Sequence, residues 1–100
     1  MKTFSEDGLC FVDMEHSLTI NEVEIFKKEI TPLLRTDKEF LIHCIDVTEI
    51  DSAGLQILIS LKKYLDREKI PFEITAGIKF KEIISFFMLD DYFKGVIIWI

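Results

Sequence analysis

The segment 40–65, FLIHCIDVTEIDSAGLQILISLKKYL, decides the fold of this chain. Its opening run, 40–45, is apolar and β-favouring, which predicts a strand buried on both faces. An acidic connection, 46–51, follows. Asp51 and Ser52 are both good N-cap residues and stand directly before a long apolar-rich helical pattern. The segment therefore predicts a strand, a turn and the start of a helix.

The turn into this helix has the chemistry of a modification site. The first N–H groups of a helix lack internal partners and carry the positive end of its dipole, so the Ser52 hydroxyl would lie where a negative group is stabilised. Gly54 removes a side chain there, which would let a partner's backbone or a phosphate approach. Ser52 is thus a candidate phosphoacceptor. Asp51 and Glu49 would repel an added charge of about −1.5 to −2, so modification should change the local field more than the fold.

The helical wheel after Ser52 predicts a docking surface. At about 100° per residue, the core stripe consists of Ile57, Leu58, Leu61, Tyr64 and Leu65. Leu55 and Ile59 fall outside this stripe, beside Lys62 and near Ser52, and would then be partly exposed. The alternative is a wide apolar stripe in which both aliphatic residues belong to the core.

Composition limits the classes of function. The chain of 100 residues predicts one domain, 1–100, with 1–8 as a flexible lead or the start of a weak edge strand. The formal net charge of −6 argues against nucleic acid or an anionic membrane as partner. Without an apolar run of about 20 residues or a basic leader, the chain is expected to be soluble and cytoplasmic. Cys10 and Cys44 are expected to be buried, reduced thiols.

The segments before residue 40 predict a strand pair and a helix. Residues 9–14 and 18–20 are predicted to form two short strands, paired antiparallel. Asn21 with Glu24 predicts a helix cap, and the helix is expected to run to about Thr31. Pro32 then ends the helix or kinks its last turn.

Beyond residue 65, apolar spacing predicts a strand at 72–76 and a helix through 80–87, then a turn or short helix at 88–93 and a final strand or apolar tail at 96–100. Alternating strands and helices predict a single α/β domain with a mixed, mostly parallel sheet of four to five strands and three to four helices. Sites in such sheets lie beyond the carboxyl ends of the strands, where 46–54 falls.

The run 46–55, DVTEIDSAGL, between a buried strand and a helix, resembles the signature of STAS domains, the anti-sigma factor antagonist family. The resemblance extends over nearly the whole chain. It implies that Ser52 is phosphorylated by a partner kinase of the anti-sigma type and that the unmodified domain sequesters this kinase until phosphorylation releases it. The predicted partner-binding residues are Asp51, Gly54, Leu55, Gln56, Ile59 and Lys62.

Two other hypotheses remain open. Ala53 and Gln56 stand where many family members have a hydroxyl residue and a glycine, and the chain also resembles single-domain members of chemotaxis-linked and lipid-transport ATPase complexes. That resemblance implies a constitutive binding subunit in which Ser52 only caps the helix. The third hypothesis, a receiver-like domain phosphorylated on Asp46, lacks the expected acidic pair after the first strand.

No enzymatic activity, cofactor or metal is predicted. His43 and Cys44 are adjacent in a strand, so they point to opposite faces and cannot chelate one ion together. Asp90 and Asp91 fit a polar loop better than an acid–base pair. The sequence contains no P-loop, GxGxxG or GxSxG motif.

Overall fold

The protein is described by a computed structural model that covers residues 1–99. The predicted end of the final strand, at Ile100, lies outside the described residues. The elements in chain order are β1 (Lys2–Glu6), β2 (Leu9–Asp13), β3 (Ser17–Leu18), α1 (Ile20–Ile30), a 3-10 turn (Thr31–Leu34), β4 (Glu39–Cys44), β5 (Glu49–Ile50), α2 (Ser52–Arg67), β6 (Phe72–Ala76), α3 (Ile78–Phe86) and β7 (Ile97–Trp99).

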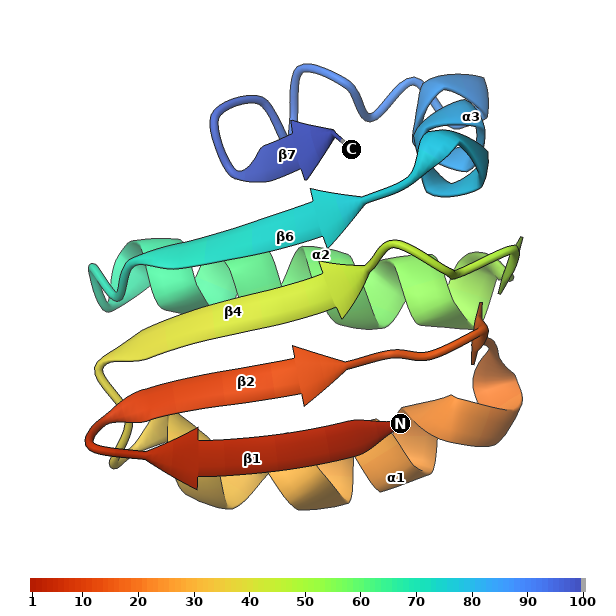
Figure 1. Ribbon diagram of the computed structural model, residues 1–100. Coiled ribbons are helices and arrows are strands. Elements are labelled where there is room, and N and C mark those ends of the chain that lie inside the picture. Colours follow the sequence, from red (N-terminus) through yellow and green to blue (C-terminus); the bar gives the residue numbers. More distant parts are fainter. Residues whose placement is uncertain (100) are drawn as a thin grey trace.

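One five-stranded sheet organises these elements. Its order is β1-β2-β4-β6-β7, with β1 antiparallel to β2 and the other neighbours parallel. Helices α1 and α2 lie on one face of this sheet, and α3 lies beyond the end of β6 (Figure 1). The predicted mixed, mostly parallel α/β fold is confirmed.

The amino-terminal strand pairing differs from the prediction. Of the two alternatives for residues 1–8, the edge strand is confirmed, and this strand, β1, rather than residues 18–20, is the antiparallel partner of β2. The segment predicted to pair with β2 forms instead the short β3, which lies parallel to β5. The two short strands meet next to the start of α2 because β5 immediately precedes that helix. The segment that leads into α2, where the site is predicted, is therefore held against the chain around residue 18.

The N-cap of α1 stands two residues before the predicted one. Thr19, not Asn21, has the extended backbone of an N-cap, and its hydroxyl oxygen accepts from the Asn21 N–H at 3.3 Å. The Glu22 carboxylate accepts from the Thr19 N–H at 2.8 Å and completes a capping box. The predicted pair of Asn21 and Glu24 was wrong, although the helix does end at Ile30, just before Thr31 and the 3-10 turn.

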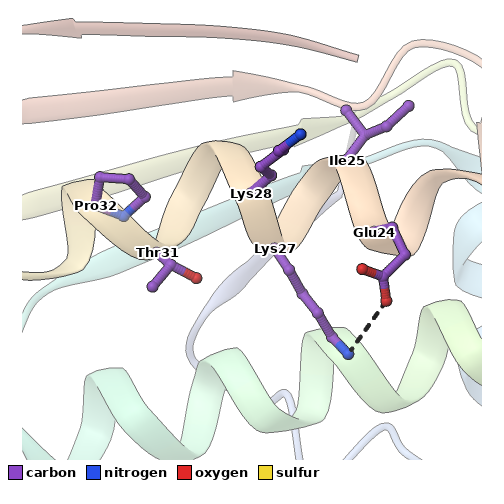
Figure 2. Close-up of a pocket in the computed structure, with 6 residues that line it drawn as sticks. All are labelled: Glu24, Ile25, Lys27, Lys28, Thr31 and Pro32. Atoms are coloured by element: carbon purple, nitrogen blue, oxygen red, sulfur yellow. Dashed lines mark ion pairs between the residues drawn. The ribbon is translucent and has the colours of Figure 1, made fainter.

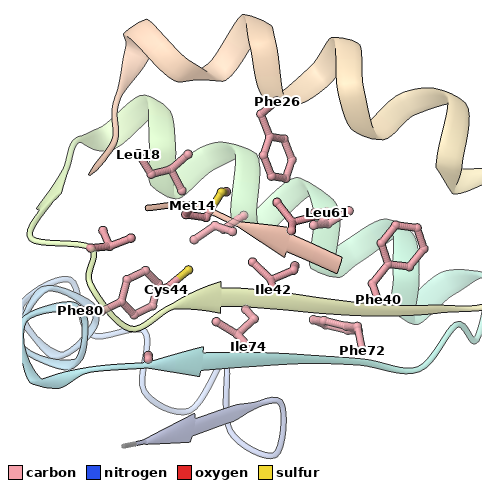
Figure 3. Close-up of a cluster of buried hydrophobic side chains, with 14 of the residues drawn as sticks. Met14, Leu18, Phe26, Phe40, Ile42, Cys44, Leu61, Phe72, Ile74 and Phe80 are labelled. Carbon is pink, nitrogen blue, oxygen red and sulfur yellow. The ribbon is translucent and has the colours of Figure 1, made fainter. Parts of the chain in front are cut away.

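The core lies between the sheet and the helices. Alternate residues of β2, β4 and β6 point into this core. Val12, Ile42 and Ile74, for example, lie side by side on neighbouring strands. Figure 3 shows Phe26 of α1 and Leu61 of α2 reaching toward the same strands. All of these side chains are buried. Burial of apolar side chains on one side of the sheet is the main stabilising contribution to this fold.

Strand β4 is buried on one face only, which corrects the prediction of two buried faces. Phe40, Ile42 and Cys44 lie in the core, whereas Leu41 and His43 are half-buried on the side without α1 and α2. The His43 ring packs on Phe11 there, with 4.6 Å between ring centroids. His43 and Cys44 thus point to opposite faces, as predicted.

Both thiols are free and buried, as predicted. Burial is the main cause that raises the pKa of Cys10 to about 11 and that of Cys44 to about 12. The two cysteines therefore act as small apolar core residues.

The carboxyl-terminal segment follows the prediction with both of its open choices resolved. Residues 88–96 form turns rather than an extra helix, and β7 then pairs parallel with β6 at the edge of the sheet. Asp90 accepts from the Ser85 hydroxyl at 2.8 Å and is exposed, as expected of a polar loop.

Candidate functional site

Asp51 fixes the starts of two helices. It is the N-cap of α2, and its Oδ1 accepts from the Gly54 N–H at 2.9 Å. Its Oδ2 accepts from the Ile20 N–H, also at 2.9 Å, in the first turn of α1. These bonds favour the ionised form and lower the pKa of the Asp51 carboxyl below 3.8, with the bond from Gly54 contributing most. Asp51, predicted to contact a partner, has both oxygens engaged within its own chain.

Ser52 is the first residue of α2 and its side chain is exposed. Asp51 takes the cap position, so the reading in which Ser52 only caps the helix was wrong. Because Asp51 accepts the Gly54 N–H of this turn and is ionised, a phosphate on Ser52 would stand at the surface beside a charged carboxylate. The hydroxyl is accessible from outside and has no role in starting the helix.

Gly54 serves internal packing. A Cβ at this position would meet the Leu18 carbonyl oxygen at 2.0 Å, so the first turn of α2 lies directly against the backbone of β3. Gly54 is buried and leaves no space for a partner's backbone or a phosphate, which corrects the role predicted for it. The missing side chain allows two elements of the same chain to approach closely.

Of the two alternatives for the α2 stripe, the wide one is confirmed for Leu55. Leu55 is only 4% exposed and belongs to the core together with Leu58, Leu61 and Leu65. Ile59 is half-buried and packs against that cluster. The apolar stripe of α2 is therefore wide, as the alternative predicted, because α1 and the segment after α3 also cover the helix.

Lys62 holds the segment after α3 in place. Its ammonium lies 2.6 Å from a carboxylate oxygen of Asp66 and 4.8 Å from the centroid of the Tyr92 ring. The Tyr92 hydroxyl also donates to the Ile59 carbonyl at 3.3 Å. Lys62 was predicted to bind a partner, but its charge is engaged with its own chain and steadies the turns after α3.

Two hollows flank the start of α2. One, of about 260 Å³, lies toward α1 and is lined by Ile20, Val23, Lys27, Ala53, Gln56, Ile57 and Ser60. The other, also about 260 Å³, is lined by Ser52, Leu55, Gln56, Ile59, Phe87 and Leu89. Gln56 is exposed and lines both. Ser52 and Gln56 are thus the predicted site residues that remain at the surface.

Exposed apolar side chains surround this surface, and sequence reasoning did not assign them to it. Phe86 is 80% exposed and Met88 89%, and both adjoin Phe87 at the rim of the second hollow. On the side of α1, Ile20 is 62% exposed. Phe86 is the last residue of α3 and Met88 lies in the turn after it, so neither belonged to the predicted site segment. We name Ile20, Ser52, Gln56, Phe86, Phe87 and Met88 the α2-start surface.

Met88 is held in a conformation that favours glycine. Its φ is 58°, and it follows Phe87, the C-cap of α3. The Leu89 N–H donates to the Ile84 carbonyl at 3.0 Å, which is the outer bond of a Schellman motif. A left-handed conformation costs a non-glycine residue about 1 kcal/mol. The chain therefore displays an apolar side chain at a position where glycine would be more stable.

A further hollow, of about 500 Å³, lies on the outer side of α1 and is lined by Glu24, Ile25, Lys27, Lys28, Thr31 and Pro32. Figure 2 shows that these side chains leave one helix in different directions, with Lys27 extending toward α2. Glu24 and Lys27 form an exposed ion pair at 3.9 Å. The residues do not converge on a common point, so this hollow is not a built site.

Metal-binding clusters and membrane-spanning helices are both absent from residues 1–99. That part of the chain holds no group of three His, Cys, Asp or Glu side chains arranged to bind a metal ion. None of its helices combines the length and the apolar character needed to cross a membrane.

Comparisons with known proteins agree with this fold. The model of the STAS domain family matches residues 2–93, so the chain belongs to the STAS domain family. The crystal structure of a candidate anti-sigma factor antagonist from Thermotoga maritima superposes with a TM-score of 0.75 at 19% sequence identity. The alignment covers 99% of this chain and 85% of that one. The sequence has no significant match among curated proteins.

The receiver-like hypothesis with Asp46 as acceptor was wrong. The family match assigns the chain to STAS domains, and the sheet has an antiparallel edge strand where a receiver-like sheet is parallel. Asp46 is exposed and lies in the turn after β4.

Gly54→Ala should destabilise the protein although alanine is the better helix former. The added methyl would press on the Leu18 carbonyl, a backbone group that cannot turn away. We expect the free energy of unfolding to fall by about 2–3 kcal/mol in urea titrations. Gln56→Ala, an exposed change on the same helix, should stay within about 0.5 kcal/mol of the parent. Equal stability of Gly54→Ala and the parent would contradict the close approach.

The contribution of Asp51 should depend on pH. Its pKa is lowered in the folded protein, so its stabilising effect is complete above the unfolded value of 3.8 and is lost as pH falls through the folded pKa. The difference in unfolding free energy between the parent and Asp51→Asn should therefore be constant near neutral pH and shrink below pH 3.8. A difference that stays the same at all pH values would show that the two bonds do not depend on the charge of Asp51.

Proposed function

We propose that this STAS domain is a non-catalytic regulatory module that binds a serine kinase of the anti-sigma type and is released when Ser52 is phosphorylated. The observation that carries the proposal is the exposed Ser52 at the start of α2, which lines a hollow together with the exposed Phe87. The structural neighbour from Thermotoga maritima supports a role of this class.

The apolar side chains supply the affinity in this proposal. Phe86, Phe87 and Met88 form one exposed group, with the two phenyl rings packed edge to face at 5.2 Å. Large apolar side chains exposed together are typical of protein interaction sites. A partner that covers them would also cover Ser52, because Phe87 and Ser52 line the same hollow.

The charge of the phosphate supplies the switch. Ser52 has an ionised neighbour, Asp51, which already accepts the Gly54 N–H of α2 and the Ile20 N–H of α1. The charge of a phosphate on Ser52 would therefore be only partly compensated. A partner that covers it with apolar side chains would remove this charge from water at a high cost in free energy. Modification would weaken binding while the core, which Ser52 does not enter, stays intact.

A constitutive binding subunit is the second candidate. It is favoured by the apolar group at residues 86–88, which could hold a partner whether or not Ser52 is modified. The two functions differ in whether the state of Ser52 changes the affinity.

The role of Ser52 can be tested with extract from the protein's own cells and Mg-ATP. Mass spectrometry should find acid-stable phosphate on Ser52 in the parent, and none at this site in Ser52→Ala. Ser60→Ala is the matched control, because Ser60 is also exposed on α2. This variant should be phosphorylated on Ser52 like the parent.

The switch itself is tested by quantitative capture of partners from the same extract. Ser52→Asp should retain about tenfold less of the kinase than the parent, while its melting temperature changes by about 2 °C or less. If parent, Ser52→Ala and Ser52→Asp retain one partner equally, the constitutive subunit is the right function and the switch is excluded.

Met88→Gly should separate binding from stability. Glycine relieves the left-handed strain, so the unfolding free energy should rise by about 0.5–1 kcal/mol, while loss of the apolar side chain should weaken partner capture several-fold. Lys69→Gly is the matched control. Lys69 also has a φ of 58° after the C-cap of its helix, α2, but is a charged residue at the far end of that helix. The Lys69→Gly variant should gain stability without any change in partner binding. A similar loss of binding in both variants would contradict the assignment of Met88 to the binding surface.

A further inference from the structure

Strand β1 leaves one edge of the main sheet open. Its strand neighbour is β2, and it stands first in the sheet order. The five residue pairs of β1 and β2 follow one another without a bulge, and β1 contains no proline. A regular edge strand of this kind presents unpaired backbone N–H and C=O groups to another strand.

The sequence of β1 is complementary to itself. It reads Lys2-Thr3-Phe4-Ser5-Glu6, so an antiparallel copy centred on Phe4 places each Lys2 opposite the other chain's Glu6. Thr3 then faces Ser5, and Phe4 faces Phe4. Opposite charges and aromatic pairs at directly facing positions both stabilise antiparallel strands. A parallel copy in register would instead oppose like charges, Lys2 to Lys2 and Glu6 to Glu6.

We propose that a second copy of this chain docks on β1, with antiparallel β1–β1 pairing about a two-fold axis at Phe4. Phe4 is 59% exposed in the single chain and is paired with Phe11 in the next strand. Phe11 in turn packs on His43. The two copies would therefore extend this row of rings from one sheet into the other, on the face away from α1 and α2.

The remaining side chains of β1 leave the edge free for this contact. Ser5 donates to the Asp37 carboxylate at 2.8 Å and 3.0 Å, which ties the strand to its own domain. Lys2 is 3.9 Å from a carboxylate oxygen of Glu15 and is largely exposed, an ion pair of little net strength. Lys2 can exchange this partner for Glu6 of the other copy at small cost.

The dimer would keep both α2-start surfaces open. β1 lies at one edge of the sheet, whereas α3 and the residues after it lie at the other edge (Figure 1). A two-fold symmetric pair formed through β1 would present two binding surfaces to a partner. This inference does not depend on phosphorylation of Ser52.

Charge exchange tests the pairing. Sedimentation velocity of the untagged chain from about 1 to 500 μM should show a monomer–dimer equilibrium. Lys2→Glu and Glu6→Lys each create two like-charge pairs across the axis and should each raise the dimer Kd about tenfold or more. The double variant K2E/E6K restores opposite charges and should dimerise like the parent. An equimolar mixture of the two single variants should form the heterodimer.

Each outcome decides the proposal. Circular dichroism first confirms that the variants are folded, as expected for exposed positions. A parent chain that stays monomeric throughout the concentration range overturns the dimer. A parent dimer that both single variants retain, or a loss in the single variants that neither the double variant nor the mixture recovers, overturns this strand pairing.

Discussion

The carboxylate of Asp51 holds together the first turns of α1 and α2, through its bonds to the N–H groups of Ile20 and Gly54. The close approach of Gly54 to the Leu18 backbone fixes the same junction from the other side. Because Leu18 belongs to β3 and β3 pairs with β5, the turn before α2 is held by hydrogen bonds and by packing at once. Ser52, which takes part in neither, is left at the surface with its backbone position determined.

This junction divides the family signature into two kinds of residue. Asp51, Gly54 and Leu55 build the turn and the core, and their side chains are not available to a partner. Ser52 and Gln56 remain exposed, next to apolar side chains contributed by other elements. A rigid junction next to a modifiable hydroxyl suits a switch that acts through surface charge, since the charge can change without rearranging the packed residues.

Much of the fold could be predicted from periodicity and from the signature, because the central strands and α2 carry strong local patterns. The edge strand β1 was ambiguous, since its residues are mostly exposed and its pairing with β2 is a property of the sheet, not of the segment. The pairing of β3 with β5 joins residues far apart in the sequence and has no local signal. Thr19 and Asn21 are both good cap residues, and only the backbone of the folded chain decides between them.

The position of the site stays a prediction, and the structure changes which of the predicted residues lie at the surface. The wheel left open whether Leu55 belongs to the core, because it could not show that the segment after α3 also covers α2 through Tyr92. For the same reason, the sequence could not show that Phe87 lines the same hollow as Ser52. The central claim is that a phosphate on Ser52 changes the surface and leaves the fold intact. Amide NMR of the protein with phosphoserine incorporated at position 52 tests this claim most directly. We expect shift changes confined to the starts of α1 and α2 and to residues 86–89; changes through β2, β4 and β6, or loss of the first turn of α2, would contradict the account.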